Sequence, residues 1–171
     1  MASDIVVRPA QAGEAQALTA LCVRSKAHWG YDAEFMRLSL ATLTVSEADV
    51  ATGCVLVAER VGLAFGMTKV EPDGELGMMF VDLLAMGRGA GRALFEASAG
   101  LARRLGARRM SILADPHAAP FYERMGARLT GRAPSDAIPA APCRSTNTTS
   151  RRADPRAMAS KRRTVSPCSG L

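Results

Sequence analysis

The sequence predicts an α/β sandwich, in which a mixed and mostly antiparallel central sheet carries helices on both faces. Three observations favour this fold class. Short apolar or alternating runs recur along the chain, as expected of strands. Other segments repeat apolar residues at helical spacing. One succession of strand, helix and strand, over residues 76–114, implies a single parallel crossover within the sheet.

Strands are expected where a short apolar or alternating run is bounded by turn residues. Pro9 ends the first strand because proline offers no amide to a ladder. Gly62 separates the second strand from the third, and Pro72-Asp73-Gly74 separates the third from the fourth. The predicted strands span residues 5–8, 54–60, 63–70, 76–84, 108–114 and 127–132.

Helices are expected where apolar residues share one stripe and capping residues flank them. Asp32 is a suitable N-cap for the second helix, and Ser46 and Asp49 have the spacing of a capped turn. Pro116 suits the first turn of the last helix, and Gly126 suits its end. The segments concerned are residues 13–26, 32–40, 46–49, 94–105 and 116–125.

A glycine-rich turn joins the strand at 76–84 to the helix that follows. It reads Met86-Gly87-Arg88-Gly89-Ala90-Gly91-Arg92. Such a turn directs free backbone N–H groups and the positive end of a helix dipole to one point, which binds phosphate. A dinucleotide-binding turn would need a third glycine where Arg92 stands, and the Gly-Lys-Ser/Thr ending of a P-loop is missing.

Three segments, in this order, resemble the GNAT acetyltransferase family. Phe80-Val81-Asp82 is similar to the end of its fourth strand, and Met86–Gly91 resembles the x-x-x-G-x-G of its acetyl-CoA loop. Phe121–Ala127 is similar to its late F-Y-x-x-x-G-F segment. The resemblance covers about residues 4–133 and implies a GNAT-type fold. It also implies an N-acetyltransferase that moves the acetyl group of acetyl-CoA to a primary amine of a small molecule or peptide, by direct attack.

The resemblance assigns cofactor binding to the loop and to the strand before it. The loop amides would bind the pyrophosphate, Arg88 and Arg92 would add charge, and the end of the strand would pair with the pantetheine arm. Met86 stands where the family usually has Gln or Arg, so weakened binding is expected. The expected cofactor-binding residues are Phe80, Val81, Met86, Gly87, Arg88, Gly89, Ala90, Gly91 and Arg92.

Tyr122 matches the family tyrosine that donates a proton to the leaving thiolate. Asp115 and His117 are weaker candidates near the cofactor. Relatives frequently carry an acid on the fourth strand as the base, whereas this chain has Gly77. The remaining candidates for the base are Glu75, Asp82, His28 and Tyr31.

His28, Trp29 and Tyr31 stand where the family places its acceptor-site helices, so they are expected to line the substrate pocket. Core packing by Trp29 explains the same position equally well. Nothing in the sequence fixes the acceptor, and a homodimer remains open. The alternative function is a catalytically impaired CoA-binding module, because Met86, Gly77 and the C-terminal sequence depart from the family pattern.

The net charge of +6 is confined to the end of the chain. Residues 1–131 hold 14 basic and 14 acidic side chains, whereas residues 132–171 hold 8 basic and 2 acidic ones. The neutral body argues against a nucleic-acid-binding protein.

We expect a cytoplasmic protein without a membrane span or a metal. The first residues are not those of a signal peptide, and no segment is long and apolar enough to cross a bilayer. Zinc is not expected with two histidines and no paired cysteines. The cysteines are widely spaced and suit a reducing compartment: Cys22, Cys54, Cys143 and Cys168.

The composition changes after Pro134, where Pro, Ser, Thr, Ala and Arg dominate. We therefore expect residues 1–133 to form the N-acetyltransferase domain and residues 134–171 to be a disordered, low-complexity basic tail. Relatives continue into a last strand after a segment like Ile-Pro-Gly-Arg-x-Leu-Pro. Residues 140–144, Ala-Ala-Pro-Cys-Arg, correspond to codons for that segment read out of frame. We hypothesise that a one-nucleotide frameshift replaced this strand and left the sheet without it.

Overall fold

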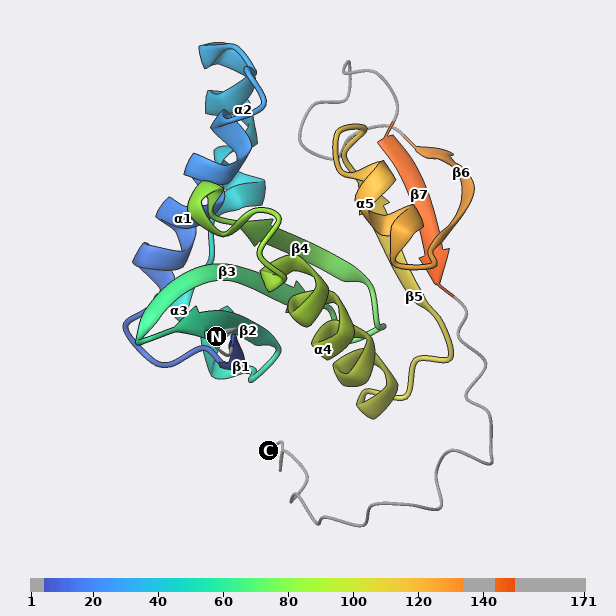
Figure 1. Ribbon diagram of the computed structural model, residues 1–171, viewed down its shortest axis with the longest axis horizontal. Helices are drawn as coiled ribbons and strands as arrows, with labels where there is room; N and C mark the ends of the chain where they lie inside the picture. Colours follow the sequence, from blue (N-terminus) through green and yellow to red (C-terminus); the bar gives the residue numbers. More distant parts are fainter. Residues whose placement is uncertain (1–4, 134–143, 150–171) are drawn as a thin grey trace.

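A computed structural model describes residues 5–133 and 144–149 (Figure 1). Its helices are α1 (Ala15–Ala27), α2 (Ala33–Leu43), α3 (Glu47–Ala51), α4 (Ala90–Arg104), α5 (Ala119–Arg124) and the short 3₁₀ helix η1 (Leu83–Ala85). Its strands are β1 (Val6–Pro9), β2 (Val55–Arg60), β3 (Leu63–Val70), β4 (Leu76–Val81), β5 (Met110–Ala114), β6 (Arg128–Ala133) and β7 (Arg144–Thr149).

The predicted helix starts at Asp32 and Ser46 are confirmed. Asp32 accepts a hydrogen bond from the amide of Phe35 at 2.8 Å and thereby caps α2. Ser46 and Asp49 form a reciprocal capping box at the start of α3. These short-range bonds satisfy amides that the helices cannot pair themselves.

Two predicted boundaries are wrong. The strand expected to reach residue 84 ends at Val81, because the Asp82 side chain accepts from the amide of Leu84 and starts η1. The last helix begins at Ala119 rather than at Pro116, since the Asp115 side chain first closes a turn by accepting from the His117 amide.

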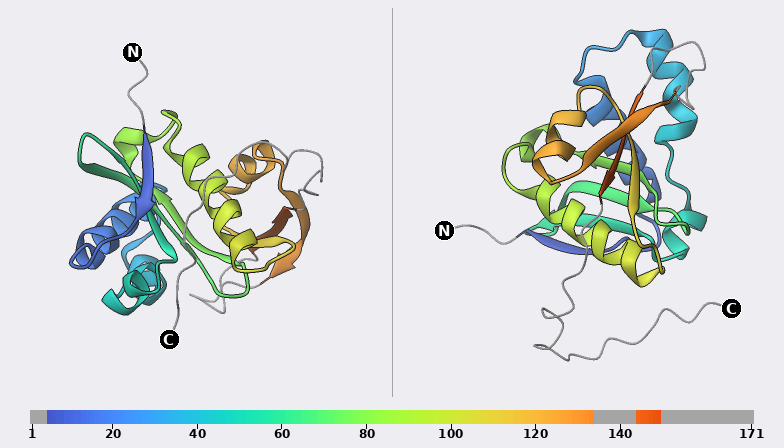
Figure 2. Two further views of the ribbon diagram at one scale, coloured as in Figure 1. Left: turned by 90° about the horizontal axis from the view of Figure 1, so that it is seen from below. Right: turned by 90° about the vertical axis from the view of Figure 1, so that its right-hand side faces the viewer.

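The strands form one seven-stranded sheet in the order β1-β2-β3-β4-β5-β7-β6. Every neighbouring pair is antiparallel except β4 and β5, which are parallel. The predicted mixed, mostly antiparallel sheet with one parallel crossover is therefore confirmed. Helices α1, α2 and α3 cover one face and α4 covers the other (Figure 2).

Helix α4 is fixed to the centre of the sheet by a buried polar contact as well as by apolar packing. The hydroxyls of Thr68 on β3 and Ser98 on α4 lie 2.9 Å apart, and both side chains are fully buried. Leu94, also fully buried, packs against the same sheet. The N-terminal end of α4, where the glycine turn enters, is therefore held in a fixed position on the sheet.

The parallel strands β4 and β5 diverge almost at once. They pair only at Leu76 and Ile112, and Figure 1 shows the two strands separating beyond this point. The rest of β4 consequently keeps an edge that β5 does not cover.

The expectation that no strand follows residue 134 is wrong. Residues 144–149 form β7, which lies between β5 and β6 and pairs antiparallel with both. The sheet is therefore continuous on this side. The other residues of the expected tail, 134–143 and 150–171, lie outside the described residues. Four of the five residues on which the frameshift hypothesis rests, 140–143, are among them.

Candidate active site

The glycine turn between η1 and α4 uses backbone angles that glycine adopts readily. Gly87 has φ 73° and Gly89 has φ 93°, so both occupy the left-handed region that other residues rarely adopt. Gly89 is the N-cap of α4 and supplies no side-chain cap. Gly87, Arg88 and Gly89 are all exposed to solvent.

The turn holds a row of amides without acceptors. The Arg88 amide donates to the carbonyl of Ala85 at 3.2 Å. In contrast, no residue in the described part of the chain accepts from the amides of Gly87, Gly89, Ala90, Gly91 or Arg92. The amides at a helix N-terminus carry partial positive charge, so this row has the donors that an anion would need.

Gly91 sits where the turn meets α5 and the end of β4. A Cβ built on Gly91 would lie 3.2 Å from the ring of Phe121 and 3.7 Å from Cγ2 of Val81. The structure therefore brings together the three segments that carry the family resemblance: the end of β4, the turn and α5.

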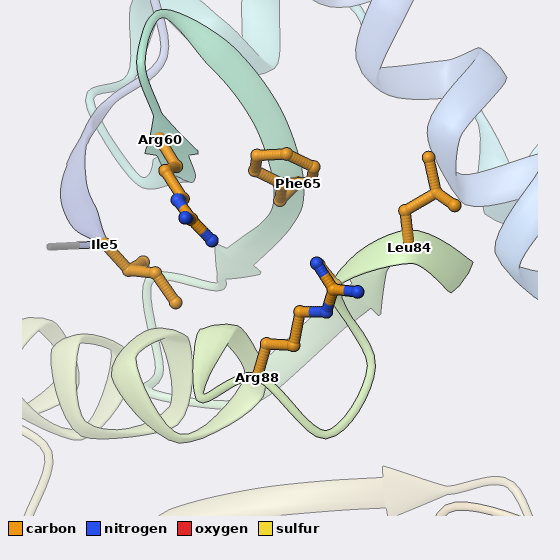
Figure 3. A pocket seen from close by; sticks show the side chains of 6 residues that line it. Ile5, Arg60, Phe65, Leu84 and Arg88 are labelled. Carbon is orange, nitrogen blue, oxygen red and sulfur yellow. The ribbon is translucent and has the colours of Figure 1, made fainter. Parts of the chain in front are cut away.

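The side chain of Arg88 points away from this junction. It lies beside Arg60, over the apolar side chains of Phe65 and Leu84, as Figure 3 shows. These residues belong to the flank of the turn that faces β1 to β3. The guanidinium group of Arg88 is thus not directed at α5, and the amides of the turn are the donors on that side.

The main-chain groups of Phe80 and Val81 point in opposite directions. The Asp82 amide donates to the carbonyl of Phe65 at 2.8 Å, and Phe80 lies opposite Met67. Residues along an antiparallel ladder alternate between hydrogen-bonded and non-hydrogen-bonded pairs. Phe80 therefore bonds to β3, whereas Val81 presents its N–H and C=O to the edge from which β5 has diverged.

Tyr122 lies in the apolar core between the sheet and α4. Its side chain is 5% exposed and lies near the rings of Phe95 and Phe121, at 6.1 and 5.2 Å between centroids. Burial raises the pKa of the Tyr122 phenol, and the negative charge of Asp115 raises it further. The phenol is therefore protonated throughout the neutral range.

An ion pair between α1 and the end of β5 organises the second half of the site. Lys26 Nζ lies 2.6 Å from Asp115 Oδ2, and the Tyr31 hydroxyl donates to the same carboxylate at 2.7–2.8 Å. Burial alone would raise the pKa of Asp115, but the hydrogen bonds from Lys26 and Tyr31 outweigh it and lower the pKa. Asp115 is therefore ionised at neutral pH.

Aromatic rings surround this ion pair. Trp29 stacks on His117 at 5.0 Å, Tyr31 stacks on Phe35 at 4.2 Å, and His28 meets the edge of Trp29. Trp29 is 42% exposed, so it is not a core residue. The segment His28–Tyr31 thus contacts Asp115 and His117, which sequence analysis had singled out separately.

Lys26 and Phe35 also belong to this cluster, although neither was predicted to be a site residue. Lys26 is 6% exposed although it carries a charge. The available signal was its position four residues after the buried Cys22, on the apolar stripe of α1. A lysine on such a stripe needs a buried acid as its partner.

The candidates for the base occupy separate places. The Asp82 side chain caps η1 and pairs with Arg24 at 3.0 Å, and these hydrogen bonds lower its pKa. His28 is held against Trp29. The amide of Glu75 donates to Asp73 in the turn between β3 and β4.

Metal clusters and membrane-spanning helices are absent from residues 5–133 and 144–149. This part of the chain holds no group of three or more His, Cys, Asp or Glu side chains placed to bind a metal. Within it Cys22 and Cys54 are free thiols, whereas Cys143 and Cys168 lie outside it. Its helices are all too short or too polar to span a membrane.

The parting of β4 and β5, together with the amides at the start of α4 that no described residue pairs, fits an acyltransferase that uses acetyl-CoA as donor. Residues 41–136 match the family model described as "Acetyltransferase (GNAT) domain". The chain belongs to the GNAT acetyltransferase family, as its sequence predicts.

Solved structures share the fold along most of the chain. A GCN5-related N-acetyltransferase from Rhodopseudomonas palustris matches with a TM-score of 0.72 and 24% identity, over 86% of this chain and 96% of that one. PaiA N-acetyltransferase from Thermoplasma acidophilum, in complex with coenzyme A, matches with a TM-score of 0.70 and 11% identity, over 86% of this chain and 99% of that one. YncA from Salmonella typhimurium, with its cofactor acetyl-CoA, matches with a TM-score of 0.60 and 22% identity, over 85% of this chain and 92% of that one. No curated protein matches the sequence.

Proposed function

We propose that the protein is an N-acetyltransferase that moves the acetyl group of acetyl-CoA to a primary amine of a small molecule or peptide. The amine attacks the thioester directly, without a covalent enzyme intermediate. One observation carries the proposal: the amides of Gly87, Gly89, Ala90, Gly91 and Arg92, which no described residue pairs, lie next to the edge of β4 that β5 leaves uncovered.

The amides of Gly87, Gly89, Ala90, Gly91 and Arg92 hold the diphosphate. Gly89 and Gly91 let the backbone approach it, since neither carries a Cβ. Arg92 is exposed and adds positive charge at the same helix end. Met86 contributes no polar side chain, and Arg88 reaches the diphosphate only if its side chain turns away from Arg60.

The free edge of β4 receives the thioester arm. Its Val81 N–H is the donor that points to this edge, so it pairs with the pantetheine chain or faces the oxygen that becomes negative during attack. Donors of this second kind typically contribute about 3 kcal/mol to transition-state stabilisation. Phe80 supports this edge by anchoring β4 to β3.

Tyr122 donates the proton to the departing thiolate. Its burial keeps the phenol protonated at neutral pH, so Tyr122 is available as a proton donor and not as a base. Tyr122→Phe is predicted to reduce kcat about 10²- to 10⁴-fold, while the Kd for acetyl-CoA and the melting temperature change little. A variant with the wild-type kcat would remove Tyr122 from the mechanism.

His28, Trp29 and Tyr31 line the side from which the acceptor amine approaches. The exposed ring of Trp29 and the stacked rings around it give an amphipathic surface that suits an amine with an apolar body. Asp115 fixes this surface through Tyr31 rather than serving as a free anion, because Lys26 already neutralises it.

Two assays on the wild-type protein test the function. Calorimetric titration with acetyl-CoA measures cofactor binding without any acceptor. Thiol release from acetyl-CoA is then followed with a polyamine, free amino acids, an aminoglycoside and short peptides. Binding with release supports the transferase, whereas binding without release for any amine favours the alternative, a CoA-binding module that has lost turnover. No binding at all would contradict both.

Three further expectations from the sequence stay predictions: a cytoplasmic location, the absence of nucleic-acid binding and a homodimer as an open state of assembly.

A further inference from the structure

The side chain of Glu71 lies over Gly77, the position on β4 where an acidic residue was expected from the family resemblance. A Cβ built on Gly77 would lie 2.6 Å from Oε1 of Glu71, and 3.2 and 3.3 Å from its Cγ and Cδ. These three atoms are the nearest to that Cβ, and all belong to Glu71. The carboxylate of Glu71 therefore occupies the space that a side chain at position 77 would enter.

Glu71 is held in this place by its own turn and by a lysine. Its carboxylate pairs with Lys69 Nζ at 3.0 Å, and Lys69 pairs in turn with Asp49 of α3 at 2.8 Å. The Glu71 amide donates to the carbonyl of Glu75 at 2.8 Å, and the Gly74 amide donates to that of Glu71 at 2.9 Å. Two main-chain bonds and an ion pair thus direct the side chain over β4.

The carboxylate also reaches solvent at the root of the diverging strands. Gly77 is exposed although β4 is an inner strand of the sheet, and it lies directly after Leu76, the residue at which β4 pairs with β5. The Glu71 side chain is 36% exposed. Its neighbour Lys69 pairs with α3, so Glu71 lies on the face that carries α1 to α3, the face of the expected acceptor segment.

We propose that Glu71 is the general base of the acetyl transfer, in place of an acid carried by β4 itself. This inference rests on the proposed function. Glu71 accepts, through water in the exposed space at Gly77, one proton from the protonated acceptor amine. The free amine then forms a C–N bond to the thioester carbon, and the C–S bond breaks. Tyr122 gives its proton to the departing thiolate, and the nitrogen of the new amide loses a second proton, which restores the Tyr122 phenol. Glu71 then returns its own proton to solvent.

The first test compares Glu71→Gln with Asp73→Asn, a matched loss of a carboxylate in the same turn. With the best amine of the panel, Glu71→Gln is expected to lower kcat at pH 7 about 10²- to 10⁴-fold. Asp73→Asn is expected to keep the wild-type rate. The deficit of Glu71→Gln narrows as the pH approaches about 10, where a primary amine loses its own proton. The Kd for acetyl-CoA, measured by calorimetry, stays unchanged.

A second test moves the acid instead of removing it. Glu71→Ala removes the three atoms that lie nearest to a Cβ at Gly77, since all three belong to Glu71. Adding Gly77→Glu to that variant places a carboxylate on β4 and is expected to recover at least about tenfold of the lost rate. A folded double variant that stays as slow as Glu71→Ala would overturn the assignment.

The outcomes separate this inference from the proposed function. A wild-type kcat and pH profile in Glu71→Gln would show that Glu71 has no role in catalysis and would overturn the assignment. A loss of rate that is equal at every pH and accompanied by a lower melting temperature would show a structural role only, and would overturn it too. If wild-type protein binds acetyl-CoA but releases no thiol with any amine, the proposed function fails first and the base assignment fails with it.

Discussion

Gly89 and Gly91 serve the turn before α4 in different ways. Gly89 needs its hydrogen side chain for its backbone angle, φ 93°, and has open space around it apart from Ile5 at 3.8 Å. Gly91 has ordinary helical geometry, but a Cβ at this position would lie 3.2 Å from the Phe121 ring. The first glycine shapes the row of amides, and the second lets α5 approach it.

Gly89→Ala is therefore predicted to weaken acetyl-CoA binding at least about tenfold by disturbing the amides. Gly106→Ala is the matched control, because Gly106 also has φ 93° and lies just beyond the other end of α4. Each substitution is expected to cost about 1 kcal/mol of stability. Calorimetry should show a weaker Kd for Gly89→Ala alone, and equal affinities in both variants would contradict the role of the turn.

At the scale of elements, the Lys26–Asp115 pair joins α1 to the end of β5. The two groups are 89 residues apart in sequence, and their side chains are 7% and 18% exposed. The pair and the Tyr31 hydroxyl hold the start of α2 against the strand that diverges from β4. The position of the acceptor segment thus depends on the ion pair between the buried Lys26 ammonium and Asp115.

Asp115→Ala is predicted to lower the free energy of unfolding by about 3–5 kcal/mol, because it leaves the Lys26 ammonium buried without a partner. Tyr31→Phe removes one hydrogen bond and is expected to cost only about 1 kcal/mol. Urea denaturation of both variants measures the difference. Equal effects would mean that the Lys26–Asp115 pair is not the main connection.

The same pair predicts a dependence on acid. Because the folded state lowers the pKa of Asp115, its ionised form stabilises the fold above the unfolded-state pKa of about 3.9, and this stabilisation is lost as the pH falls through the folded value. The difference in melting temperature between wild type and Asp115→Asn should shrink from pH 7 to about pH 2. A constant difference over that range would contradict the lowered pKa.

For the whole molecule, the position of β7 decides whether the sheet is continuous. β7 pairs with β5 on one side and with β6 on the other. Without β7, β6 would lose the strand that joins it to the sheet, and β5 would keep only its pairing with β4. A chain ended after Ala133 is predicted to melt at least about 10 °C below one ended after Thr149. Thermal melts followed by circular dichroism compare the two, and equal melting temperatures would mean that β7 adds nothing to the fold.

Local features were predictable and distant ones were not. The left-handed glycines of the turn and the cap at Asp32 depend on neighbours within three residues, so the sequence specifies them directly. The strand Arg144–Thr149 contains no apolar residue, so hydrophobic alternation could not reveal it. The pairing of Lys26 with Asp115 depends on how the sheet brings segments 89 residues apart together. The position of Glu71 over Gly77 depends on the exact shape of the turn between β3 and β4, which residue types alone do not specify.

The central claim is that the main-chain amides of the glycine turn bind the diphosphate of acetyl-CoA while the free edge of β4 receives its arm. Titrating ¹⁵N-labelled protein with acetyl-CoA tests it amide by amide. The largest shifts are predicted at Gly87, Gly89, Ala90, Gly91 and Arg92, with Val81 following. Shifts confined to the flank around Arg60 and Phe65, or no shifts in the turn at saturation, would contradict the claim.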